Sequence, residues 1–165
     1  MAHQDPCFSR PEDFKDPLQN YDSKKYKNPI EQALAEETAV LIKHQPCASI
    51  RPDTTVAEAV KKLADFHIAC LPVENEGKLV GVFSDRNVLD KVALEYDELK
   101  DRPVSDVMTP NPVYVYETDP SASVLSVMAV SGYRHVPILD LNDNLVGIAS
   151  PQRVTQFLQN FFDEE

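Results

Sequence analysis

The sequence has no tryptophan and no long apolar stretch. No apolar run approaches the ~20 residues that a helix needs to cross a bilayer, although 42% of the 165 residues are hydrophobic. Residues 1–10 carry acidic, proline and polar groups where a secretory signal has an apolar block. We therefore expect a globular, cytoplasmic protein that does not bind membranes, built as one domain or as two small halves packed together.

Cysteine is scarce and histidine is scattered. The cysteines are odd in number and share no metal-like spacing, so we expect free thiols in a reducing compartment, with two of the three (Cys7, Cys47 and Cys70) in or near the core. None of the 4 histidines lies in a metal-binding pattern, such as two histidines flanking a glutamate on one helix. No serine has the glycine-flanked turn of a hydrolase. The sequence predicts no enzyme, no metal site and no required cofactor.

Cationic residues are the minority among charged groups. Lysine and arginine number 16 against 27 aspartates and glutamates, which gives a formal net charge of −11. Because a phosphate backbone requires a basic surface, this balance argues against DNA or RNA as a partner. Any smaller phosphate ligand must be held by local cations against an unfavourable overall field.

One motif is present twice. Residues 145–150 (Leu-Val-Gly-Ile-Ala-Ser) repeat residues 79–84 (Leu-Val-Gly-Val-Phe-Ser) 66 positions later. Upstream, residues 135–139 mirror residues 70–73 around a shared proline, at an offset of 65. A single one-residue slip over such a length indicates duplication of one structural unit.

Each copy predicts the same order of strand, helix, strand, strand and helix, which is an α+β fold. The alternation of short apolar strands with helical periodicity places these elements at residues 48–50, 54–67, 70–73, 78–83 and from 84 onward, and again at 113–116, 123–131, 135–139, 145–149 and 150–162. A brief helix over 104–108 leads into the second copy, and a longer one over 30–43 leads into the first.

The predicted domain division has three parts. Residues 30–98 form the first repeat with its lead-in helix, and residues 99–165 form the second repeat. Residues 1–29 are broken by prolines and are either a disordered tail or an extended arm whose aromatic side chains dock on the body. These aromatics are Phe8, Phe14, Tyr21 and Tyr26.

Several segments resemble the CBS domain, a family named for cystathionine beta-synthase. They are the lead-in 107–112 (Val-Met-Thr-Pro-Asn-Pro), the strand 134–140 and the strand-to-helix step 147–150, with a similar first copy through residues 71–73 and 81–84. The resemblance covers about residues 30–162. It implies two βαββα repeats packed sheet to sheet as a pseudo-twofold pair, a Bateman-type regulatory module, with two clefts that bind adenosine-containing ligands in many relatives.

The first cleft is expected around Ser84. A serine at a helix start lies beside unpaired backbone amides, which favour a bound anion. Nucleotide-binding relatives carry Ser or Thr, two residues, then an Asp for the ribose; here Asn87 stands in that place, and its amide can still bond a ribose diol. Alternatively, Ser84 is only a cap and Asn87 only a polar residue of the first turn. Thr109, in the lead-in motif, is a further ligand-binding candidate.

The second cleft departs further from the family pattern. Ser150 is followed at the same spacing by Arg153, which cannot accept a hydrogen bond from ribose but can pair with a phosphate. Arg134 and His135 resemble the basic pair that reaches ligand phosphates in some relatives; alternatively they are a solvated edge residue and a side chain packed on the sheet. This cleft is expected to be empty, filled by Arg153, or tuned to phosphate.

Three functions remain open from the sequence. The first is a regulatory module that senses an adenine nucleotide (AMP, ADP or ATP) and alters an effector protein of unknown identity. The second is a structural dimerisation module with vestigial clefts, and the third is a sensor of another adenosine ligand such as S-adenosylmethionine. In each case we expect a homodimer that pairs through apolar helix faces. These faces are Val88, Leu89 and Val92 in one copy and Phe157, Leu158 and Phe161 in the other.

Overall fold

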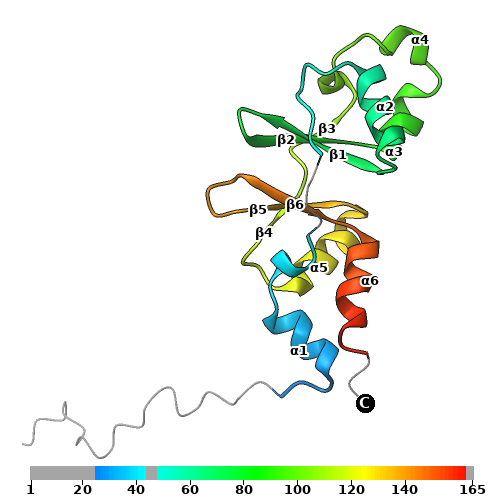
Figure 1. Cartoon of the computed structure of the whole chain (residues 1–165). Helices are drawn as coiled ribbons and strands as arrows, with labels where there is room; N and C mark the ends of the chain where they lie inside the picture. Colours follow the sequence, from blue (N-terminus) through cyan, green and yellow to red (C-terminus); the bar gives the residue numbers. More distant parts are fainter. Residues whose placement is uncertain (1–24, 44–47, 163–165) are drawn as a thin grey trace, which may run out of the picture.

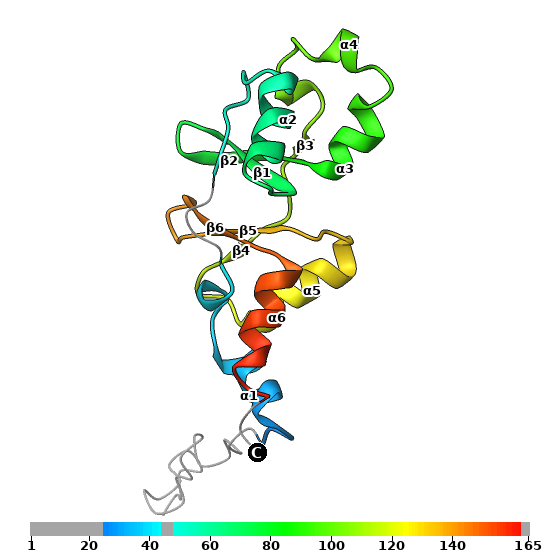
Figure 2. The same cartoon turned by 45° about the vertical axis from the view of Figure 1, so that its right-hand side comes forward.

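The computed structural model describes residues 25–43 and 48–162. The two sheets lie against each other at the centre of the module, with helices α2, α3 and α4 on one outer side and α1, α5 and α6 on the other (Figures 1 and 2). The predictions for Cys7, Cys47 and the aromatics at positions 8, 14 and 21 fall outside the described residues. Cys70 is buried, as expected.

The helices and strands follow the order that the duplication predicts. The helices are α1 (Pro29–Glu36), the 3₁₀ helix η3 (Ala39–Leu41), α2 (Val56–Asp65), α3 (Asp85–Asn87), the π-helix η4 (Val88–Val92), α4 (Tyr96–Leu99), the 3₁₀ helix η5 (Val104–Asp106), α5 (Ser121–Ser131) and α6 (Pro151–Gln159). The strands are β1 (Cys70–Asn75), β2 (Lys78–Ser84), β3 (Thr109–Pro110), β4 (Val115–Tyr116), β5 (Val136–Leu139) and β6 (Leu145–Ala149).

Each repeat contributes one three-stranded sheet built on a hairpin. β1 pairs antiparallel with β2, and β3 adds to β2; β5 pairs antiparallel with β6, and β4 adds parallel to β5. Gly77 takes a positive φ of 79° in the first hairpin turn, a conformation that glycine adopts without strain. The α+β prediction and both hairpins are confirmed.

The chain start packs on the second repeat. The backbone N–H of Ala39 donates to Asp119 O at 2.8 Å, and Ser121 Oγ donates to Glu37 O at 2.9 Å. Ala39 and Ile42 are buried in the core of the second repeat rather than the first. The N-terminal lead-in therefore covers α5, although it precedes the first repeat in sequence.

Two cores lie on the outer sides of the sheets, and a small seam joins the sheets. One core gathers around Phe83, Leu71 and Val56, and the other around Ile138 and Phe157. Between the sheets, Cys70, Val82 and Ile148 form a separate buried cluster. Burying these apolar surfaces stabilises the packing of the repeats, at roughly 25 cal/mol for each Å² removed from water.

The helix that follows the second hairpin strand differs between repeats. In the first, α3 is only three residues long and continues as the π-helix η4, which leaves Leu89 72% and Leu94 98% exposed. In the second, α6 is a regular helix of nine residues that begins with Pro151. Proline suits this position because its missing N–H would be unpaired there in any case.

Several predicted elements are shorter in the structure than the sequence indicates. The helix expected over 30–43 ends at Glu36, because Glu37 and Thr38 turn extended, and the chain resumes as a 3₁₀ turn. The strand expected over 48–50 is a single parallel bridge from Ile50 to Val73. The lead-in helix expected over 104–108 is the short η5, since the following residues extend into β3.

Candidate ligand-binding site

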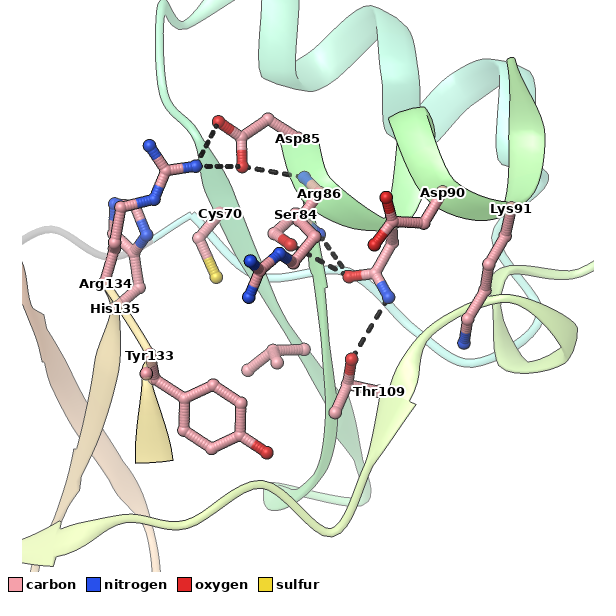
Figure 3. Close-up of a pocket in the computed structure, with 13 residues that line it drawn as sticks. Cys70, Ser84, Asp85, Arg86, Asp90, Lys91, Thr109, Tyr133, Arg134 and His135 are labelled. Atoms are coloured by element: carbon pink, nitrogen blue, oxygen red, sulfur yellow. Dashed lines mark hydrogen bonds and ion pairs between the residues drawn. The ribbon is translucent and has the colours of Figure 1, made fainter. Parts of the chain in front are cut away.

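A pocket of about 180 Å³ opens where the first repeat meets the start of β5. Side chains from both repeats line it (Figure 3). The lining residues are Cys70, Val82, Ser84, Asp85, Arg86, Asn87, Asp90, Lys91, Thr109, Gly132, Tyr133, Arg134 and His135. Five of the seven predicted site residues are thereby brought together: Ser84, Asn87, Thr109, Arg134 and His135. The placement of Arg134 and His135 in a second cleft was wrong, because they reach the Ser84 pocket from the segment before β5.

Asn87 forms the buried floor of this pocket. It is 5% exposed, and its Oδ1 accepts from the backbone N–H of Ser84 and from Ser84 Oγ, both at 2.9 Å. Its Nδ2 donates to Val107 O at 3.2 Å and to Thr109 Oγ1 at 3.1 Å. The amide thus uses both of its N–H groups and both acceptor positions within the protein. A ribose diol would have to displace one of these bonds to reach Asn87.

The lead-in to the second repeat closes over the same floor. Lys91 Nζ donates to Val107 O at 3.0 Å and to Met108 O at 3.1 Å. A Cβ on Gly81 would lie 2.4 Å from Met108 Sδ and 3.1 Å from Thr109 O. A side chain at Gly81 would therefore crowd the lead-in, which passes directly over β2.

An ion pair joins the two repeats at the pocket rim. Arg134 NH2 contacts the carboxylate oxygens of Asp85 at 3.1 and 3.3 Å, and the backbone N–H of Arg86 donates to Asp85 Oδ1 at 2.7 Å. Burial lowers the pKa of the neighbouring His135, while Asp85 raises it and Arg134 lowers it to smaller extents. Burial therefore favours the neutral form of His135, and Arg134 supplies the positive charge at this edge of the pocket.

Helix electrostatics at Ser84 are weaker than the sequence predicts. An anion site at a helix start relies on several aligned backbone dipoles. The α-helical part after Ser84 is three residues long, and Ser84 itself is held by Asn87. Side-chain cations at the pocket therefore matter more for binding an anion than the helix start does.

Ser150 and Arg153 do not line this pocket. They lie at the start of α6, where the backbone N–H of Arg153 donates to Ser150 Oγ at 3.4 Å. The guanidinium of Arg153 donates from NH1 to Gln156 Oε1 at 3.1 Å, along its own helix. The roles predicted for both residues in a second cleft remain predictions.

Five lining residues with charged or hydroxyl side chains were not among the residues predicted from the sequence: Asp85, Arg86, Asp90, Lys91 and Tyr133. Three of them were within reach of it, because Asp85 and Arg86 lie between Ser84 and Asn87, and Tyr133 precedes the predicted pair Arg134 and His135. Asp90 and Lys91 follow Asn87 by three and four residues, a spacing that places side chains on one helix face.

Neither a metal cluster nor a membrane-spanning helix is found within residues 25–43 and 48–162. No group of three or more His, Cys, Asp or Glu side chains there could hold a metal ion. No helix of this part of the chain is both long and apolar enough to cross a bilayer.

Comparison with curated proteins gives relatives that share part of their length with this chain. A 17.7 kDa protein of Acidianus ambivalens is 32% identical over 61% of this chain, which spans 60% of that protein. The inosine-5'-monophosphate dehydrogenase of Methanocaldococcus jannaschii is 34% identical over 71% of this chain, which spans only 22% of the enzyme.

A solved structure and a family model match over both repeats. The structure of CBSX2 from Arabidopsis thaliana in complex with AMP is 26% identical, covers 74% of this chain and 96% of its own, and aligns with a TM-score of 0.66. The model of the CBS domain matches residues 40–94 and again residues 104–160. The chain belongs to the CBS domain family, as a pair of such domains.

Proposed function

We propose that this chain is a regulatory module that senses an adenine nucleotide, with AMP as the leading ligand. The observation that carries the proposal is a pocket shared by both repeats and lined by more cations than carboxylates, in a chain of net charge −11. The cations are Arg86, Lys91 and Arg134, against Asp85 and Asp90. The AMP complex of the related CBSX2 structure supports the choice of ligand.

The ion pair at the pocket rim could couple ligand binding to a change in the relative position of the two repeats. Arg134 comes from the second repeat and Asp85 from the first. A ligand phosphate competes with the Asp85 carboxylate for the guanidinium of Arg134, because both offer oxygen pairs that match its geometry. Binding would thus exchange a contact between repeats for a contact with ligand, and shift the repeats relative to each other.

Thermal unfolding with and without ligand tests the proposal. A ligand at 100 times its Kd that binds only the folded state adds about 2.7 kcal/mol. For a chain of this size, that raises Tm by roughly 5 to 10 °C. We expect AMP to produce such a shift. A rise in Tm with S-adenosylmethionine alone would favour a sensor of that ligand. No rise in Tm with any adenosine ligand would favour a structural dimerisation module.

We also propose that the module is a homodimer that acts on a separate effector, in the cytoplasm. Exposed apolar side chains on η4, on the turn after it and on α5 support pairing: Leu89, Leu94 and Val130 are 72%, 98% and 87% exposed. Val92 and Phe157, expected on the pairing faces, are instead buried in the cores of the two repeats. Light scattering should give twice the 18.5 kDa of one chain. A mass of one chain across micromolar concentrations would refute the dimer.

A further inference from the structure

Most polar side chains of the pocket are already committed to the protein. Asn87 makes four hydrogen bonds, Lys91 donates to two carbonyls, and Arg134 pairs with Asp85. Two charged side chains remain. Among the described residues, neither Arg86 nor Asp90 makes a side-chain hydrogen bond or ion pair.

The fold orients these two groups toward the pocket. Asp90 and Lys91 lie in the π-helix η4, where Ala93 N donates to Val88 O at 2.8 Å. Val92 is fully buried in the core of the first repeat, which fixes the rotation of this turn. The guanidinium of Arg86 points into the pocket, and the carboxylate of Asp90 lies between Arg86 and Lys91 in this view (Figure 3). Wide helical turns of this kind occur frequently at functional sites.

We propose that Asp90, rather than Asn87, accepts the ribose hydroxyls of the ligand, and that Arg86 binds its phosphate. This inference rests on the proposed function. A carboxylate has two oxygens with free acceptor positions, which match the two O–H donors of a vicinal diol. A guanidinium pairs bidentately with phosphate oxygens. Asn87 then acts as a positioning residue that holds the floor beneath both groups.

The local charges fit this division of roles. Asp90 is next to Lys91, whose ammonium group lies at the lead-in carbonyls. Lys91 lines the same pocket as Asp90, so its positive charge offsets part of the repulsion between the carboxylate and a bound phosphate. Arg86 and Asp90 both line the pocket from the segment that follows Ser84. One nucleoside monophosphate therefore spans both groups.

Two affinity ratios test the assignment by calorimetry. Asp90→Asn should lower the preference for AMP over 2',3'-dideoxy-AMP by roughly tenfold to a hundredfold, since bonds to charged groups are the strong ones. The preference of the Asp90→Asn variant for AMP over adenosine should stay near that of the parent protein. Arg86→Gln should do the reverse, reducing the preference for AMP over adenosine and leaving the diol preference unchanged.

Asp97→Asn is the matched control, because it removes one negative charge from the same repeat at a side chain that is 94% exposed on α4. It should keep both parental ratios. If the parent binds AMP and Asp90→Asn keeps the parental diol preference, the assignment of Asp90 is wrong although the proposed function stands. If the parent binds neither AMP nor adenosine, the proposed function fails and the assignment fails with it.

Discussion

The two repeats begin their last helices with the same serine and then diverge. After Ser84, the side chain three residues on is an amide that turns inward and holds the strand, the helix start and the next lead-in together. After Ser150, it is Arg153, which donates along its own helix to Gln156. An amide both donates and accepts, whereas a guanidinium only donates. One side chain thus separates a junction that builds a pocket floor from one in which the guanidinium lies along its own helix.

The largest effect expected from this difference is on stability. Asn87→Ala leaves the backbone N–H of Ser84, Ser84 Oγ and Thr109 Oγ1 without this partner, while Val107 O keeps its bond from Lys91 Nζ. We expect a loss of about 2 to 4 kcal/mol, since each unsatisfied buried group costs on the order of 1 to 3 kcal/mol and neighbouring groups relax. Tm should fall by roughly 5 to 15 °C in a thermal melt.

Arg153→Ala is the matched variant in the second repeat. Its guanidinium makes one bond, to the exposed Gln156, so the loss should stay within about 0.5 kcal/mol. Equal losses at the two positions would show that the repeats do not differ as described.

The repeats also differ at one pair of matched positions, where the second repeat has a histidine and the first has a cysteine. His135 stands where the first repeat has Cys70. Burial lowers the pKa of His135 in the folded state below the ~6.5 of an unfolded chain. The unfolded state therefore binds more protons, and the free energy of unfolding should decline as pH falls below about 6.5, until the lowered folded pKa is passed.

Urea unfolding at pH 7.5 and pH 5.5 measures this decline, and His135→Gln should flatten it. Asp140 does not contribute to the change in the free energy of unfolding over this pH range. Hydrogen bonds from Asn144 lower its pKa in the folded state, so its contribution is lost only as pH falls below about 4. An unchanged slope in His135→Gln would assign the pH dependence to another group.

The smallest effect concerns the ion pair that links the first junction to the second repeat. The side chains of Arg134 and Asp85 are 65% and 44% exposed, so water screens their attraction. Exposed pairs contribute about 0 to 1 kcal/mol, and Arg134→Ala should change the free energy of unfolding by less than about 0.5 kcal/mol. A loss above about 2 kcal/mol in urea unfolding would mean that the pair holds the repeats together.

The duplication made most of the fold predictable. A glycine, a proline and a serine at matched offsets fixed both hairpins and the order of elements, because turn and cap chemistry is local. The crossing of the N-terminal lead-in onto α5 was not predictable from local pattern, since it depends on which repeat has an uncovered apolar surface. The short α3 and the π turn at Val88 were likewise hidden, because apolar spacing alone does not distinguish a π turn from an α-helix.

The candidate site was predictable in position more than in role. Ser84 was expected in the first cleft and Arg134 in the second, whereas both line one pocket together with the candidate Thr109. The sequence did not reveal that Asn87 would be buried with four bonds, because its partners Val107 and Thr109 lie 20 and 22 residues away. Which side chains stay uncommitted depends on such distant contacts, so Arg86 and Asp90 emerged only with the structure.

Calorimetric titration of AMP into the unmodified protein tests most directly the claim that the Ser84 junction, and not the Ser150 junction, makes the nucleotide site. We expect saturable heat with one AMP bound per chain. Two sites of equal affinity per chain would contradict the difference between the repeats, and the absence of binding heat at several temperatures would contradict nucleotide sensing itself.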